Sequence, residues 1–290
     1  MNPGNGRKED HQKRYAEKEN NQMKETEKNA GGNTAVRGMS VTHHIDRVKQ
    51  PRGGYLNPKS MTVTLLGDGM EALHEKENIN PGVVGAAVDY LTRFLLGTPK
   101  EEAFAVSVIG AMNIGERKNA EKLLEEVKGL DDQSVINAVK LCSYDVCFRS
   151  GRMWYRPVEE IMPDAETIDN IRMMVERSLK FIEAYGPKVL DGFDFEGGYT
   201  QLVTSGDGDF TTKDTLWDWK VTKKPINKDQ TLQLLMYWRM GLHSVHPEFK
   251  DIRYLGIFNP RTNKVYRIAT ADIDANVIKE VEEKVIGYKE

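Results

Sequence analysis

Two short segments set the architecture of this chain: Ser205-Gly206-Asp207-Gly208-Asp209-Phe210 and, after a gap of five residues, Leu216-Trp217-Asp218-Trp219-Lys220-Val221. Both have the composition of β-strands, and Lys213-Asp214 lies midway between them. We predict a hairpin with its turn at this dipeptide. A two-residue or a four-residue loop with this centre pairs Phe210 with Trp217 and Asp209 with Asp218.

Successive side chains of a strand point to opposite faces of the sheet. Asp218 and Lys220 therefore share one face with Leu216, and the two tryptophans share the other. Directly opposed residues of an antiparallel pair have Cβ atoms about 5 Å apart, where like charges repel. If Asp209 lies opposite Asp218, the repulsion between the two carboxylates must be offset. The commonest means is a divalent metal ion, for which carboxylate oxygens are natural ligands.

The next segment, 228–241, predicts a helix with Asn227 as its N-cap. Gln230, Gln233 and Tyr237 share one face of this helix. Residues 253–259 and 264–268 then predict two further strands, and a final helix is predicted from Asp272 to about Tyr288.

Gly206-x-x-Asp209, then Asp218-x-Lys220, then Gln233-x-x-x-Tyr237 resembles the motif set of the PD-(D/E)XK nuclease superfamily, in particular its RecB-like and Cas4-like branch. The resemblance covers roughly residues 193–270. It implies an α/β fold, with a restriction-endonuclease-like mixed sheet flanked by helices. It also implies a metal-dependent deoxyribonuclease, exonucleolytic or active on single strands, of a phage, mobile-element or defence setting. The sequence, with two cysteines and no apolar signal region at its start, separately predicts a cytoplasmic protein.

By this resemblance, Asp209, Asp218 and the backbone carbonyl of Trp219 would bind Mg²⁺ or Mn²⁺. Lys220 would orient or help deprotonate the attacking water, or offset phosphate charge. Gln233 and Tyr237 would support the site or contact the substrate. Asp207 faces the same side as Asp209 and is the alternative ligand, although the spacing from the preceding glycine favours Asp209.

Asp89 lies in a predicted helix that begins near Pro81 and ends before Gly97. Its context, Gly85-Ala86-Ala87-Val88-Asp89, resembles the family's first motif, in which a helix of small residues presents a metal ligand. The alternative is an aspartate on the solvent face of the helix.

Two other interpretations remain open at this level. Asp218 and Lys220 form an ordinary surface ion pair in one of them, with Gln233 and Tyr237 as plain helix-surface groups. In the other, the chain is a catalytically inactive protein of the nuclease fold that binds nucleic acid or another protein. The segment 149–156, with three arginines next to Trp154 and Tyr155, suits either single-strand binding or packing on the core.

The remaining sequence predicts a polar, disordered tail over 1–34 and a single domain over 35–290. The helical part of the domain spans about 80–186, and the sheet core spans about 193–290. A strand is expected at 61–66. Another is expected at 193–204, with a bulge at Gly197-Gly198.

Composition limits the choice of partners and cofactors. The net charge of −3 gives no global attraction to nucleic acid, so a DNA-binding surface must be local. A protein partner or a homo-oligomer stays open. Cys142 and Cys147 are too few for the four thiolates of an iron–sulfur cluster, and we interpret them as small buried residues. No apolar run is long enough to span a membrane.

Overall fold

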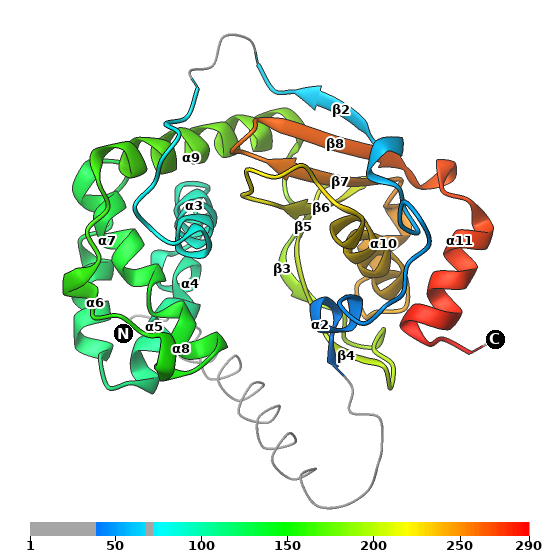
Figure 1. The fold of residues 1–290 in the computed structure, drawn as a ribbon, viewed down its shortest axis with the longest axis horizontal. Helices are drawn as coiled ribbons and strands as arrows, with labels where there is room; N and C mark the ends of the chain where they lie inside the picture. Colours follow the sequence, from blue (N-terminus) through cyan, green and yellow to red (C-terminus); the bar gives the residue numbers. More distant parts are fainter. Residues whose placement is uncertain (1–38, 68–71, 290) are drawn as a thin grey trace, which may run out of the picture. The chain divides into compact units, whose positions relative to one another are not determined.

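A six-stranded mixed sheet with helices on both faces organises residues 39–67 and 72–289, which the computed structural model describes (Figure 1). The predicted polar tail at 1–34 lies outside these residues. The strand order across the sheet is β2 (Thr62–Leu65), β8 (Lys264–Ala269), β7 (Tyr254–Asn259), β6 (Thr215–Trp219), β5 (Asp207–Thr211) and β3 (Leu190–Asp194). β2 therefore belongs to the sheet, which extends beyond the range 193–290 predicted for it.

The hairpin predicted at Lys213-Asp214 is confirmed. Phe210 lies opposite Trp217, and the Thr212 N–H donates to the Thr215 carbonyl at 2.9 Å across the turn. β6 and β7 are parallel, and every other neighbouring pair in the sheet is antiparallel. The parallel pair is connected through α10 (Lys228–Leu242), as parallel neighbours require a crossover.

The single strand predicted at 193–204 is wrong. The chain leaves the sheet at the end of β3 and returns to a separate two-stranded parallel ladder of β1 (Met39–Ser40) and β4 (Val203–Ser205). The cause lies at the two glycines expected to form a bulge. Gly197 has φ of +88°, and a Cβ on Gly198 would lie 2.2 Å from the Met240 carbonyl oxygen. They turn the chain and bring it against the end of α10.

The two faces of the sheet are covered by different helices. α10 and the C-terminal helix pack on the face that carries Leu216 and Leu255. α9 (Ala165–Tyr185) covers the other face, where Phe181 stacks on Phe258 with ring centroids 4.2 Å apart and meets Trp217 edge-on at 4.8 Å. Gly256 makes room for the indole, because a Cβ there would lie 2.3 Å from the Trp217 ring.

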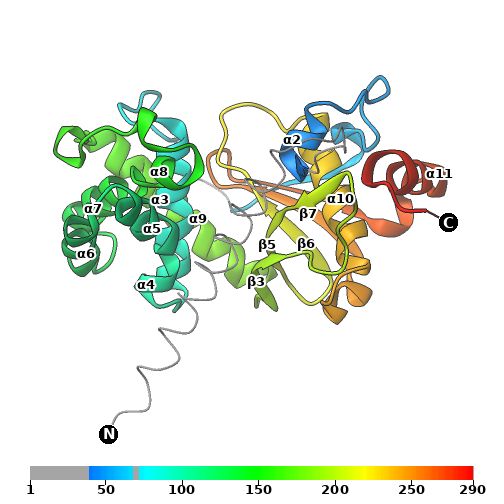
Figure 2. The same cartoon turned by 90° about the horizontal axis from the view of Figure 1, so that it is seen from below.

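α9 also joins the sheet to the helical part of the molecule (Figure 1). Its first half packs through Ile171 and Met174 against that part, and its second half lies on the sheet. The helices gathered there, apart from α10 and α11 in Figure 2, are α3 (Pro81–Leu95), α4 (Lys100–Ala103), α5 (Ala105–Asn113), α6 (Arg117–Glu125), α7 (Asp132–Cys142) and α8 (Asp145–Arg149). Side chains cap the N-termini of α3 and α9, since Asn80 accepts from the Gly82 N–H and Asp164 from the Thr167 N–H.

The C-terminal helix begins later than predicted. Asp274, and not Asp272, caps α11 (Ala275–Glu280), which continues as a π-helix over Val281–Ile286 and ends at Gly287 with φ of +90°. Asp272 lies in the preceding 3₁₀ turn. Near the other end of the described chain, α2 (Val41–Ile45) packs on α10. Within the described ranges, no helix is long and apolar enough to cross a membrane.

A buried ion pair joins the segment before α3 to the turn between β7 and β8. Arg261 contacts Glu77 through both ends of its guanidinium, at 2.6 and 3.0 Å. Both side chains are only 5% exposed. Asn170 of α9 donates to the same carboxylate at 2.9 Å, so three distant segments meet at one buried charge pair.

Candidate active site

Asp209 and Asp218 face each other where β5 and β6 separate. The paired register of the two strands ends with Phe210 opposite Trp217, and Asp209 and Asp218 are the next residues beyond that last pair. In a continued ladder, Trp219 N–H would donate to the carbonyl of Gly208. Here it donates to Oδ2 of Asp209 at 2.5 Å. The strands therefore part at this point, and the Asp209 carboxylate takes the released backbone donor.

Gly206, the first residue of the Gly-x-x-Asp motif, permits close packing beside the site. A Cβ at this position would lie 2.9 Å from Cγ2 of Val41 and 3.5 Å from the ring of Tyr237. Its absence lets α2 and α10 approach the start of β5. This supplies a steric reason for glycine three residues before Asp209.

A chain of polar contacts runs from Asp218 to α10. Lys220 Nζ lies 3.0 and 2.8 Å from the two carboxylate oxygens of Asp218, and it donates to Gln233 Oε1 at 3.2 Å. Gln233 Nε2 in turn donates to the hydroxyl of Tyr237 at 2.8 Å. The end of β6 and the following helix, α10, thus bring four of the predicted residues into one network.

The N-terminus of α10 fixes the placement of this network. Asn227 accepts from the Gln230 N–H at 3.0 Å, and the Gln230 side chain accepts from the Asn227 N–H at 2.9 Å. This reciprocal capping box satisfies two backbone donors at the helix start. Gln230 is therefore committed to capping, whereas Gln233 and Tyr237, one turn apart, point to the strand ends. The interpretation of Gln233 and Tyr237 as plain helix-surface groups is wrong, because Tyr237 is buried and Gln233 is half-buried.

Burial makes this cluster electrostatically unusual. It raises the pKa of Asp209 to about 7, with a further contribution from the charge of Asp218. Burial likewise raises the pKa of Asp218, although Lys220 opposes this shift. For Lys220, burial lowers the pKa, but Asp218 and Asp209 outweigh it and the pKa is raised. Lys220 is accordingly an ammonium donor at neutral pH, and its pair with Asp218, which is 2% exposed, is no solvent-exposed ion pair.

Asp89 lies on the same cleft as Asp209, half-buried, so its assignment to the solvent face is wrong. Burial raises its pKa, and the charges of Arg93 and Lys188 oppose the shift. Both cations also approach Asp191 of β3, with Lys188 Nζ 2.8 Å and Arg93 Nε 3.8 Å from it. Arg93 lies four residues after Asp89 on α3, a local relation that the sequence could have shown, whereas nothing local links Lys188 to Asp89.

The donor set fits a hard divalent cation that is completed by other ligands. Among the described residues, no three His, Cys, Asp or Glu side chains converge as a ready ligand set. Mg²⁺, however, is usually held by one or two carboxylates together with water and substrate phosphate. Both carboxylate oxygens of the buried Asp218 are contacted by Lys220 Nζ, Oδ2 at 2.8 Å and Oδ1 at 3.0 Å. The Trp219 carbonyl faces β5, because the N–H and C=O of one strand residue point the same way.

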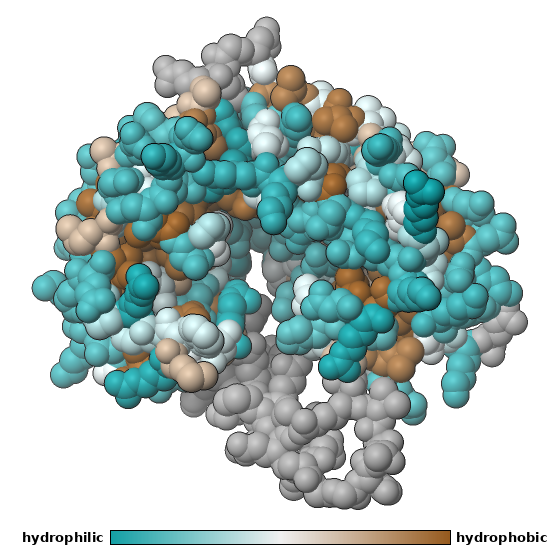
Figure 3. Space-filling view, in the orientation of Figure 1, coloured by the Kyte–Doolittle hydropathy of each residue, from teal (hydrophilic) through white to brown (hydrophobic). Residues whose placement is uncertain are grey.

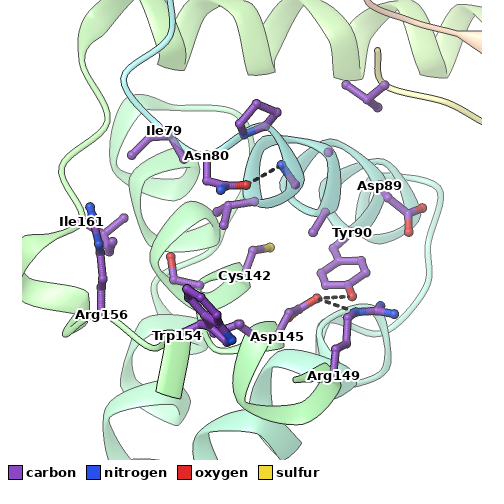
Figure 4. A pocket seen from close by; sticks show the side chains of 18 of the residues that line it. Ile79, Asn80, Asp89, Tyr90, Cys142, Asp145, Arg149, Trp154, Arg156 and Ile161 are labelled. Carbon is purple, nitrogen blue, oxygen red and sulfur yellow. Dashed lines mark hydrogen bonds and ion pairs between the residues drawn. The ribbon is translucent and has the colours of Figure 1, made fainter. Parts of the chain in front are cut away.

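A cleft of about 1020 Å³ opens beside the carboxylates. Asp209 and Trp219 line one part of it. The rest is lined by α3 with the residues just before it and by α8 with the loop after it (Figure 4). The surface in Figure 3 is hollowed between the helices and the sheet. Sequence analysis missed one lining group, the buried Asp145, which accepts from Tyr90 at 2.7 Å and from Ser107 at 2.6 Å.

Both cysteines are buried and free, as expected of small core residues. Cys142 lies at the wall of the cleft, and burial raises the pKa of its thiol well above the ordinary value. A neutral thiol of this kind is a poor nucleophile and a poor metal ligand.

No protein-family model matches this sequence, and no curated protein or solved structure is significantly similar to it. An assignment of function has to come from the motifs and from the geometry described above.

Proposed function

We propose that this protein is a metal-dependent nuclease of the PD-(D/E)XK type, in its RecB-like and Cas4-like branch, that hydrolyses phosphodiester bonds in DNA. One observation carries the proposal: the contacts Asp218–Lys220–Gln233–Tyr237 beside Asp209 unite residues of β5, β6 and α10. The mixed sheet with helices on both faces is compatible with a restriction-endonuclease-like fold.

Asp209, Asp218 and the Trp219 carbonyl are the groups that would hold Mg²⁺ or Mn²⁺, with Asp89 as a further predicted ligand. When bound, such an ion would lower the pKa of a coordinated water molecule and neutralise the charge of the phosphate. The two carboxylates must be ionised to bind the cation. Because the pKa of Asp209 is high, cation binding depends on pH.

The remaining residues of the network position charge and protons. Lys220 carries its ammonium between Asp218 and Gln233, where it would orient a water molecule or offset the charge that develops on a phosphate. Gln233 has its amide oriented from both sides, accepting from Lys220 and donating to Tyr237. Tyr237 thus acts through Gln233, as a positioning residue.

The test is cleavage of labelled single- and double-stranded DNA and RNA in Mg²⁺ and in Mn²⁺. Wild type is compared with Asp218→Ala, Lys220→Ala and the control Lys223→Ala, whose exposed amine contacts only the Glu75 carbonyl in the described structure. We expect cleavage of DNA by wild type and the control, and none by the two site variants when both are folded. Binding of nucleic acid without any cleavage by wild type would instead support an inactive protein of the same fold.

A further inference from the structure

The cleft continues from the carboxylates to a rim that the proposed chemistry does not use. Arg149 of α8, Trp154 and Arg156 line this rim, with Arg149 on the same side as Asp89 and Arg156 on the opposite side (Figure 4). Trp154 belongs to a 3₁₀ turn, Arg152–Trp154, that follows α8 directly. The rim and the candidate site are thus parts of one continuous cavity.

The rim exposes large apolar side chains. The Trp154 residue is 69% exposed, and Met162, which also lines the cleft, is 62% exposed. Tyr155 is different, because it stacks on Tyr144 at a centroid distance of 5.5 Å and so anchors the loop to the core. An exposed tryptophan on an anchored loop offers a flat apolar surface that the fold itself leaves uncovered.

Cations stand on either side of this indole in the sequence. Arg156 is exposed, and Arg149 is mostly exposed, with Nε 4.0 Å from Asp145. Asp145 also accepts from Tyr90 and Ser107, and the Arg149 side chain is 60% exposed, so its guanidinium is accessible to a further partner. Arginines beside an exposed aromatic ring are the groups that bind the backbone and stack the bases of a single strand.

We propose that the cleft binds a single-stranded DNA end, with a base stacked on Trp154 and the backbone held by Arg149 and Arg156, so that the strand leads to Asp209. The placement of the scissile bond rests on the function proposed above, whereas the binding does not.

The size of the cleft favours a single strand. The cleft volume of about 1020 Å³ is close to the upper end of pockets for one compact ligand, roughly 300–1,000 Å³, so it holds a few nucleotides and excludes a duplex. The lining also includes Asp89, Glu160 and Asp209, which repel phosphates. Binding is accordingly expected to strengthen when a divalent cation neutralises the carboxylates.

The chain provides matched controls for two of the rim residues, Trp154 and Arg156. Met153, next to Trp154, is 84% exposed and does not line the cleft. Arg152, like Arg156, is exposed, and it also does not line the cleft. Substitution of each pair with alanine removes side chains of similar exposure from the same loop, so that folding defects affect both members alike.

The experiment measures the affinity for a labelled single strand of about 12 nucleotides, a length within the ~4–16 nucleotides that single-strand sites cover. Fluorescence anisotropy is recorded in Mg²⁺ with Lys220→Ala as the common background, which limits cleavage, and with a hairpin duplex as the second probe. Trp154→Ala should weaken binding roughly 5- to 100-fold. Arg156→Ala should lower the slope of log affinity against log salt by ~0.7, the effect of one phosphate contact. Met153→Ala and Arg152→Ala should change neither quantity.

Equal effects of Trp154→Ala and Met153→Ala would overturn the proposal, as would a duplex bound as tightly as the single strand. The two proposals fail separately. Wild type that cuts DNA while Trp154→Ala leaves binding unchanged refutes the single-strand cleft alone. Wild type that cuts nothing but loses binding with Trp154→Ala refutes the nuclease function alone.

Discussion

Asp209→Asn is expected to stabilise the metal-free protein at neutral and higher pH, even though it removes a residue of the candidate site. Burial, together with the charge of Asp218, raises the pKa of Asp209 from 3.8 to about 7. The folded state therefore holds this proton more tightly than the unfolded state. The associated stability is fully present below pH 3.8, falls as the pH rises, and is lost above about pH 7.

The magnitude follows from the two pKa values. The difference between 3.8 and about 7 corresponds to an upper limit of roughly 4 kcal/mol, at ~1.36 kcal/mol for each pH unit. Asparagine has nearly the same shape, and its amide oxygen can still accept from Trp219 N–H. We expect a gain of about 2–4 kcal/mol at pH 8, or roughly 5–15 °C in melting temperature at ~2–4 °C per kcal/mol.

The assay is urea denaturation of wild type and Asp209→Asn in EDTA, from pH 5 to pH 8. Asp251→Asn serves as the control, because Asp251 is an exposed aspartate far from the cleft. The stability difference between Asp209→Asn and wild type should grow with pH, whereas the control should follow wild type. A variant less stable than wild type at pH 8, or a difference independent of pH, would refute the electrostatic reasoning.

Two further predictions concern the framework of the site. Arg261→Met leaves the buried Glu77 carboxylate without its cation, and urea denaturation should show a loss of about 3–5 kcal/mol. Gly256→Ala places a Cβ 2.3 Å from the Trp217 ring, so the melting curve should report a loss of about 1–3 kcal/mol, whereas Gly129→Ala, with nothing within 4 Å of its Cβ, should lose less.

The parts of the site that sequence could predict are those set by local rules. Alternation along the strands and the dipeptide Lys213-Asp214 fix the register, which pairs Phe210 with Trp217 and leaves Asp209 and Asp218 as the next residues on either strand. The spacing of Gln233 and Tyr237, one helical turn, places both on one face of α10, and Asn227 marks where that helix begins. These features need only neighbours a few residues apart.

The parts that could not be predicted depend on contacts between distant segments. Gly197 has a left-handed conformation, which the presence of a glycine in a strand-like sequence is not enough to predict. Arg261 and Glu77 are 184 residues apart, and neither has a local partner that would reveal the pairing. The surroundings of Asp89 follow the same pattern, since Lys188 reaches it only through the packing of β3 and α3.

The central claim is that Asp209 and Asp218 form a cation site of the folded protein, and the dependence of melting temperature on Mn²⁺ concentration tests it most directly. A ligand that binds only the folded state stabilises it by about 2.7 kcal/mol at 100 times its dissociation constant, and by more at higher concentration. We predict a melting temperature that keeps rising with Mn²⁺ in wild type and stays constant in folded Asp218→Ala. No rise in wild type, or an equal rise in Asp218→Ala, would contradict the account.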